Sequence, residues 1–415
     1  MKRTRIRRRN RVFRRRHVGR VIGKICLWLL VIPVAIGGYY LADYLVNRTP
    51  SSPADTPADS PAVVTEPSAA PTTAPTEEPT AGSDGVRPAD LRAIYLPPAA
   101  LRDLAARGDT LTAASAAGYN AVIVDLKDAD GALWYASATE LAVAAGAARE
   151  DALTLEELRA VATTLRESYH LTLVPRLFAF RDNTAPRNLE TARVTVAGEP
   201  STCWFDASPS AGGRRWLNPY AADARRYITS LASELTGAGF PLLMLDGVQF
   251  PDREVRAYYG DAEQTALSRS AILTQFVSEM NEAVGSNGWL LCETALAAVG
   301  EKTTVYGGNP VTYGAPAVAP WTLPSQLGSK LTLGGETIAS PASQPYEALS
   351  LLLAQLQARL QLMDAAAVHP VVVPWLQADD CTPAQIADQQ RAVTERFGER
   401  APYILYSASG QYAFA

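Results

Sequence analysis

From residue 89 to its end, the chain alternates short apolar runs with longer segments of helical periodicity. Within each run the apolar residues are continuous and do not alternate with polar ones. Strands of this kind are buried on both faces, and a helix between consecutive strands makes them parallel. The clearest runs occupy residues 92–96, 120–128, 171–180, 241–250, 288–296, 369–377 and 402–409. The sequence therefore predicts an α/β fold with a parallel sheet covered by helices.

Amphipathic segments fill the intervals and predict helices at residues 98–118, 154–170, 218–239, 268–285, 345–367 and 382–398. Pro383 after Thr382 suits the first turn of a helix, and Gly237 and Gly398 suit helix ends. The seven strands, with an eighth within 301–340, fit a (β/α)8 TIM barrel over residues 89–415. A doubly wound open sheet is the alternative, but no Gly-rich turn follows the first strand.

The residues before the barrel begin with a basic tail and an apolar segment. Residues 1–24 carry 12 Lys and Arg and no acid, and residues 25–42 carry no charge. We expect residues 25–46 to form a transmembrane anchor, since the uncharged stretch is about long enough to cross a bilayer. The positive-inside rule then places the tail in the cytoplasm and the C-terminal domain outside, in a single-pass cell-membrane topology. No small-residue cleavage site follows, so an uncleaved anchor is favoured over a signal peptide.

Residues 47–88 form a predicted disordered linker. The stretch 49–88 holds nine prolines and no aromatic residue, so it cannot bury enough apolar surface to order itself. It is typical of a semi-extended spacer between a membrane and a domain. An Arg-rich tail can bind nucleic acid, but beside an apolar segment we expect contact with the membrane instead. Residues 49–415 carry a net charge of about −16, which favours neutral or cationic partners over polyanions.

Polar residues gather where the predicted strands end. Asp246 closes the apolar run "PLLMLD", where a buried ionised carboxylate is costly unless it is paired. Catalytic residues of TIM barrels lie at these carboxyl ends. Polar and aromatic residues at the strand ends are Asp125, Lys127, Asp128, Arg176, Asp246, Gln249, Glu293, Trp375, Gln377 and Tyr406. Acidic, aromatic and amide groups at one mouth are typical of sugar-active sites. Asp125 and Lys127 could instead form a structural ion pair, and Trp375 could belong to the core.

Several other chemistries are excluded by the residues that are missing. The chain has three histidines and none follows a predicted strand, so a Ser-His-Asp hydrolase or a His-ligated zinc enzyme is not expected. The three cysteines beyond the anchor are widely spaced, and neither a P-loop nor a dinucleotide-binding fingerprint occurs. We therefore expect no metal and no cofactor, and carboxylate chemistry remains.

Six segments carry a resemblance to a known family. They are "AVIVDLKDADG" (121–131), "LVPRLFAFRD" (173–182), "RRWLNPY" (214–220), "LDGVQFP" (245–251), "VVPWLQA" (372–378) and "YILYSAS" (403–409). In this order the chain resembles a family of glycoside-hydrolase-like TIM barrels built on a domain of unknown function. The resemblance covers about residues 91–415 and implies a barrel with a sugar-active site.

The motifs match residue by residue, with departures. Asp125, Lys127 and Asp128 match an Asp-x-Lys-Asp motif after the second strand, and Asp246 matches the aspartate after the fourth. The segment 374–377 matches a Pro-Trp-Leu-Gln motif after the seventh. Where the family has an arginine and a tyrosine after that aspartate, this chain has Gln249 and Gly247. Without that arginine, we expect the pKa of Asp246 to be higher. The family's Tyr-Pro signature on the sixth strand is not found.

The sequence thus predicts a membrane-anchored glycosidase outside the cytoplasm that acts on glycan. Asp246 would be the nucleophile or would stabilise an oxocarbenium-like state, with Glu293 as general acid/base. This arrangement is similar to that of α-amylase-type barrels. Asp125 would orient Lys127 or a sugar hydroxyl, and the remaining strand-end residues would bind substrate. The alternative is a catalytically silent barrel that binds cell-surface or wall glycan.

Overall fold

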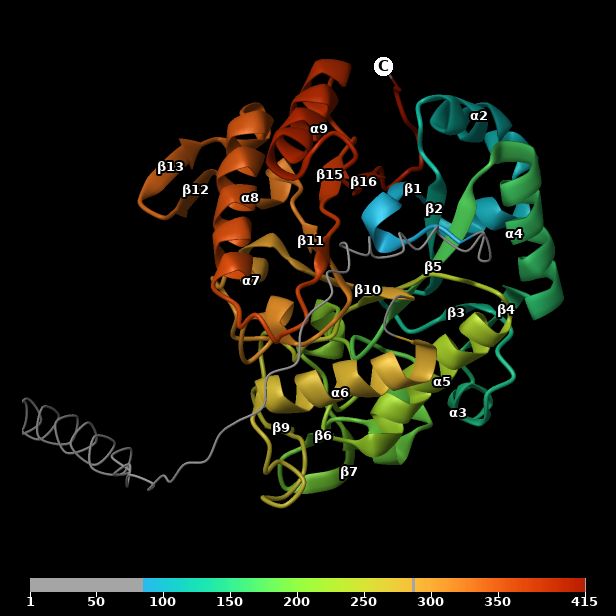
Figure 1. The fold of residues 1–415 in the computed structure, drawn as a ribbon. Helices are drawn as coiled ribbons and strands as arrows, with labels where there is room; N and C mark the ends of the chain where they lie inside the picture. The colour runs from blue at the N-terminus through green and yellow to red at the C-terminus, as the bar shows by residue number, and fades with distance from the viewer. Residues whose placement is uncertain (1–84, 286–287, 415) are drawn as a thin grey trace, which may run out of the picture. The chain divides into compact units, whose positions relative to one another are not determined.

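The computed structural model describes residues 85–285 and 288–414, and eight parallel strands form a closed barrel within them (Figure 1). β1 pairs with β2 on one side and with β16 on the other, which closes the sheet. The barrel strands are β1 (Arg92–Leu96), β2 (Ala121–Lys127), β5 (Thr172–Phe178), β8 (Leu243–Asp246), β10 (Trp289–Thr294), β11 (Ala317–Trp321), β15 (Trp375–Gln377) and β16 (Tyr403–Tyr406), with β14 (Val371–Val372) just before β15. The predicted TIM barrel is confirmed, and the closure excludes the open sheet.

The eighth strand is β11, whose sequence is "AVAPW". It was hidden from pattern analysis because Pro320 interrupts a short apolar run, and proline inside a central strand usually argues against a strand. Here Pro320 lies opposite Glu293 of β10, and Trp321 lies opposite both Thr294 and Trp375 of the flanking strands.

The helices outside the barrel agree with the amphipathic segments (Figure 1). They are α2 (Gly108–Ala116), α4 (Leu155–Tyr169), α5 (Ala222–Gly237), α6 (Arg269–Val284), α8 (Pro345–Gln361) and α9 (Pro383–Phe397), with the short α3 (Glu140–Ala145) and α7 (Ala295–Ala298). Thr154 and Thr382 form capping boxes at the starts of α4 and α9. The single helix expected over 98–118 is wrong, because two 3-10 turns precede α2. Gly237 is the last residue of α5, and Gly239 takes the positive φ expected just beyond that helix.

The longest excursions all follow the carboxyl ends of barrel strands. β3 (Leu133–Tyr135) and β4 (Ala148–Leu153) follow β2, and β6 (Thr195–Val196) and β7 (Glu199–Cys203) follow β5. β9 (Ala257–Tyr258) follows β8 and pairs with β6, while the hairpin of β12 (Lys330–Leu333) and β13 (Glu336–Ala339) follows β11. These insertions form a rim on the side of the barrel where TIM-barrel sites lie.

Two buried layers result from the strand alternation. Ile123, Met244 and Cys292 pack inside the barrel, whereas Val122, Leu245 and Leu291 pack between the barrel and the helices. Successive side chains of a strand point to opposite faces, so the position of a residue along its strand decides which layer it enters.

The expected basic tail (1–24), anchor (25–46) and nearly all of the linker (47–88) lie outside the described residues. Within 85–285 and 288–414, none of the helices combines the length and the apolar character that a bilayer crossing requires.

Candidate active site

Seven barrel strands each direct one polar or aromatic side chain toward the same mouth. These residues follow the phase of the interior core and lie at or near the carboxyl ends of their strands. They are Tyr95, Asp125, Arg176, Asp246, Trp321, Trp375 and Tyr406. The contacts among them form one connected cluster, which we call the mouth cluster.

Arg176 is the centre of the mouth cluster. Its Nε donates to Asp125 Oδ1 at 2.5 Å and its Nη2 donates to Asp125 Oδ2 at 3.1 Å. This two-point contact fixes the plane of the guanidinium. Tyr95 Oη also donates to Asp125 Oδ2, at 2.9 Å. Asp125 therefore holds the arginine and one tyrosine in place.

The same guanidinium faces a second carboxylate and four aromatic rings. Arg176 Nη1 lies 3.6 Å from Asp246 Oδ2 and has no hydrogen-bond partner within the described residues. Its carbon Cζ lies 5.0–5.4 Å from the ring centres of Tyr95, Phe178, Trp321 and Trp375. Attraction to the ring faces stabilises a cation that is withdrawn from water. Nη1 is itself buried, and the carboxylate of Asp246 is the group that it faces.

Asp246 ends β8 in the phase of the barrel interior. Its Oδ1 accepts from the backbone N–H of Gly247 at 2.6 Å, and its Oδ2 accepts from Trp321 Nε1 at 3.3 Å. Burial raises the pKa of Asp246, while the Arg176 cation opposes the rise. The direction agrees with the expectation from the missing arginine at position 249. The main cause is burial, and Arg176 of the neighbouring strand supplies the cation.

An aromatic platform completes the mouth. Trp321 stacks on Trp375 with ring centres 4.3 Å apart and planes 6° apart. Tyr406 meets the edge of both indoles, and its ring centre lies 5.0 Å from that of Tyr95. Trp375 is fully buried beneath Trp321, so the open platform consists of Trp321 and Tyr406. Flat aromatic faces of this kind suit the apolar faces of sugar rings.

A cavity of about 610 Å³ lies above the platform. It brings together five of the predicted site residues, namely Arg176, Asp246, Gln249, Glu293 and Tyr406. Trp321 was not predicted as a site residue, because its strand was not recognised from the sequence. The available signal was the Pro-Trp pair at 320–321, which repeats the Pro-Trp pair at 374–375 of the seventh predicted strand.

Glu293 reaches this cavity from a different direction. It is only 1% exposed, and neither carboxyl oxygen has a hydrogen-bond partner in the described part of the chain. Burial raises the pKa of Glu293 well above the ordinary value, which favours the neutral acid over the carboxylate. Along β10, Glu293 lies two residues after Leu291 and so shares its outer face. Asp246 lies two residues after Met244 and so shares its inner face. The two carboxyl groups therefore leave their strands on opposite faces.

Lys127 does not join the mouth cluster. Its side chain is fully buried, its Nζ lies 2.8 Å from Asp182 Oδ2, and it donates to the carbonyl of Phe178 at 2.7 Å. The ion pair considered between Asp125 and Lys127 is therefore wrong. The pairing of β2 with β5 shifts register between these two residues, and this irregularity directs the lysine away from Asp125.

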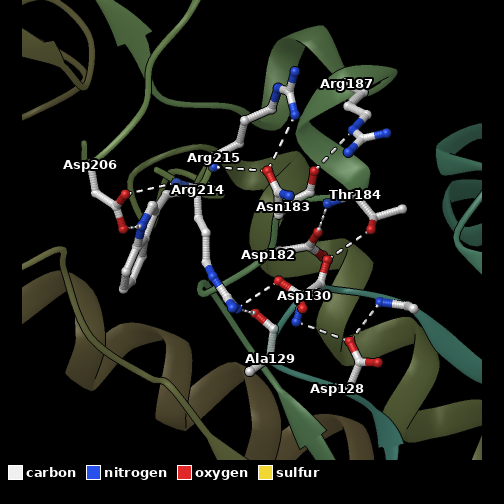
Figure 2. Close-up of polar contacts among 12 residues, drawn as sticks. Asp128, Ala129, Asp130, Asp182, Asn183, Thr184, Arg187, Asp206, Arg214 and Arg215 are labelled. Carbon is white, nitrogen blue, oxygen red and sulfur yellow. Dashed lines mark hydrogen bonds and ion pairs between the residues drawn. The ribbon is translucent and has the colours of Figure 1, made fainter. Parts of the chain in front are cut away.

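Asp128 and Gln377 stabilise loops. Asp128 Oδ1 accepts from the backbone of Asp130 and Ala132, at 2.9 and 3.0 Å, and so closes the turn after β2 (Figure 2). Gln377 Oε1 accepts from Ser325 N at 3.0 Å, and its Nε2 donates to a backbone carbonyl at 2.8 Å. Both side chains are occupied by the protein, and neither lines the cavity above the platform. Within the described residues no group of three or more His, Cys, Asp or Glu is placed to hold a metal ion.

A closed barrel with carboxylates, an arginine and an aromatic platform at its carboxyl mouth defines a TIM-barrel protein of the glycoside-hydrolase-like class. The chain belongs to the family described as "Putative glycosyl hydrolase domain", whose model matches residues 93–412. The resemblance found in the six sequence segments is confirmed by this match. Among curated proteins there is no significant match.

Solved structures of similar fold include the glycoside hydrolase domain of PgaB (BpsB) from Bordetella bronchiseptica. It is 13% identical, with a TM-score of 0.52 over 77% of this chain and 94% of that one. A hypothetical protein from Ruminiclostridium thermocellum is 20% identical, with a TM-score of 0.41 over 48% of this chain and 96% of that one. The glycoside hydrolase domain of PelA from Pseudomonas aeruginosa is 12% identical, with a TM-score of 0.39 over 78% and 97%. At these identities the likeness concerns the fold.

Proposed function

We propose that this protein is a glycosidase that hydrolyses O-glycosyl bonds of a glycan. The observation that carries the proposal is the position of Asp246. This carboxylate ends an interior strand beside Arg176 and Trp321, on the wall of a cavity large enough for a sugar. A carboxylate beside an aromatic platform can stabilise the positive charge that develops on the anomeric carbon.

In the proposed reaction Asp246 acts as nucleophile or stabilises the oxocarbenium-like state. Arg176 keeps Asp246 oriented through the ion pair of its Nη1. Glu293, whose pKa is raised by burial, is the proposed general acid that protonates the leaving oxygen. Burial raises the pKa of both carboxyl groups, but only at Asp246 does a cation, Arg176, oppose the rise, and this difference suits the two roles. Asp125 positions Arg176 and does not itself contact the sugar.

A screen of neutral, cationic and acidic polysaccharides for reducing ends tests the proposal. The full chain purified in mild detergent should release new reducing ends from at least one class. Release that is unchanged in the Asp246→Asn variant would remove this residue from its role.

Substitution of the proposed acid should depend on the leaving group. Glu293→Gln should lower kcat by about 10²- to 10⁴-fold on natural glycan, because protonation of the leaving oxygen is lost. On an activated aryl glycoside, whose leaving group needs no proton, the loss should be within a few-fold. Equal losses on both substrates would contradict a general-acid role.

The same glutamate should make stability depend on pH. Its pKa in the folded chain lies above the ordinary value of 4.5, so the folded state binds more protons than the unfolded state above pH 4.5. The free energy of unfolding should therefore fall as pH rises from about 4.5, by up to about 1.4 kcal/mol per pH unit from this group. Urea denaturation between pH 4 and 8 should show a smaller fall in Glu293→Gln. Parallel curves would mean that Glu293 ionises normally.

The alternative is a silent barrel that binds cell-surface or wall glycan. The outward phase of Glu293 on β10 favours it, because the acid does not share the inner face with Asp246. Glycan binding with no reducing-end release, in both the wild type and Asp246→Asn, would support this alternative.

We further propose that residues 25–46 anchor the protein in the cell membrane and that residues 89–415 act outside the cytoplasm. The uncharged stretch and its basic flank support this topology. Protease added to intact cells should remove the barrel domain and leave the basic tail protected. Protection of the whole chain would contradict the topology.

A further inference from the structure

A second cavity, of about 400 Å³, adjoins the cavity at the mouth. The two share Arg181, Gln249 and Asp252 as lining residues, so they adjoin at these side chains. We call the second cavity the arginine groove, and its other charged lining residues are Asp206, Arg214 and Arg253. A cavity beside the one that Asp246 lines is suited to a neighbouring sugar of a glycan chain.

Two charged residues of the arginine groove are already occupied. Arg214 Nη1 lies 2.6 Å from Asp130 Oδ1, so this side chain ties two loops together (Figure 2). Asp206 accepts from Trp216 Nε1 at 3.0 Å and from the backbone N–H of Arg214 at 2.7 Å (Figure 2). These contacts build the wall and leave little capacity for a ligand.

Arg181 and Arg253 differ from these residues. In the part of the chain that the structure describes, neither guanidinium has an ion pair with a carboxylate or a side-chain hydrogen bond within the protein. Arg181 is half-buried and lines both cavities, whereas Arg253 is exposed at the outer end. Asp252 is the one lining acid of the arginine groove whose side chain is likewise without such a contact among the described residues. The free charge in this groove is therefore positive on balance.

The backbone beside Arg181 leaves room for this side chain. Gly247 follows Asp246 and has a φ of +63°. A Cβ at position 247 would lie 3.3 Å from Arg181 Cβ and 3.5 Å from a ring carbon of Phe178. A larger residue at 247 would therefore press on Arg181 at the junction of the two cavities. Glycine both accepts the backbone conformation and leaves the arginine its place.

We infer that the arginine groove binds the carboxylate of an acidic sugar, so that the substrate is a uronic-acid-containing glycan. This inference rests on the proposed function, since it names the class of glycan for the same site. A planar guanidinium matches a carboxylate through two parallel hydrogen bonds. The two cavities then carry opposite charges at their walls. Positive charge develops on the sugar at Asp246, and the negative substituent of a neighbouring sugar lies against Arg181 and Arg253.

The net charge of the domain does not oppose this assignment at close range. The acidic surface favours neutral or cationic partners during long-range approach. At physiological salt, exposed charges are screened beyond about 8 Å. Contacts made inside the groove are shorter than that and depend on the local guanidinium groups.

Binding measurements separate this inference from the proposed function, because they do not require turnover. The full chain in mild detergent is titrated with oligogalacturonate, with a neutral oligosaccharide of equal length and with a sulfated oligosaccharide. Oligogalacturonate should bind at least about tenfold more tightly than the neutral oligosaccharide. Arg181→Gln should remove most of that preference, and Arg253→Gln should reduce it. Arg400→Gln, which makes the same charge change in the turn before β16, should leave it intact.

Each outcome is decisive for the inference. Equal binding of acidic and neutral oligosaccharides, or an equal loss in Arg181→Gln and Arg400→Gln, would overturn it. Tighter binding of the sulfated oligosaccharide than of oligogalacturonate would overturn the assignment to carboxylate. Uronate binding that depends on Arg181, without any release of reducing ends, would support the inference while contradicting the proposed hydrolysis.

Discussion

Replacement of Asp246 by asparagine should lower kcat by about 10³-fold while the barrel stays folded and glycan binding persists. Asparagine is nearly isosteric, and its single side-chain oxygen can accept from one of the two donors that hold Asp246, Gly247 N or Trp321 Nε1. It cannot act as a nucleophile or supply negative charge to an oxocarbenium-like state. Initial rates on the best substrate from the polysaccharide screen, with binding measured separately, would show the effect.

The control for this variant is Asp388→Asn. Asp388 pairs with Arg391 on the outer helix α9, with Nη2 and Oδ1 2.9 Å apart, so its loss makes the same chemical change far from the mouth. Its kcat should stay within a few-fold of wild type. If Asp246→Asn behaves like this control, another carboxylate carries the reaction.

Lys127→Met should lower the free energy of unfolding by roughly 3–5 kcal/mol, because it leaves a buried carboxylate without its cation. Lys127 and Asp182 are both 0% exposed, and their charged atoms lie 2.8 Å apart. Asp182 Oδ1 would still accept hydrogen bonds from the backbone N–H groups of Thr184 and Ala185, but Oδ2 would lose its ion-pair partner. Chemical denaturation monitored by tryptophan fluorescence measures the change.

Two further variants make this result specific. Lys127→Met with Asp182→Asn should recover part of the stability, because the uncompensated charge is gone and the Oδ1 acceptor remains. Arg87→Met breaks an ion pair of the same 2.8 Å length whose side chains are 76% and 55% exposed. An exposed pair contributes about 1 kcal/mol or less. A similar loss in Arg87→Met and Lys127→Met would show that burial of the pair is not the cause.

The fold could be predicted because its signals are local. Continuous apolar runs, capped helices and regular spacing define seven strands and the surrounding helices without knowledge of distant contacts. β11 could not be recognised, because Pro320 breaks its pattern and only pairing with β10 and β15 makes the segment a strand. The same failure concealed Trp321.

The candidate site could be predicted only in part. Asp246 and Arg176 were recognised because strand ends meet at one mouth in any barrel. Their partners could not be assigned, since a register shift within β2 sends Lys127 to Asp182 and leaves Asp125 for Arg176. The face of β10 to which Glu293 points could not be predicted either. In a continuous apolar run, the sequence does not show which alternate residues point into the barrel.

The insertions that follow β2, β5, β8 and β11 all belong to one end of the barrel. The opposite end is joined by short turns, such as the two residues between α5 and Phe240. Substitutions in these four insertions can therefore change the surroundings of the mouth cluster while the barrel strands stay unaltered.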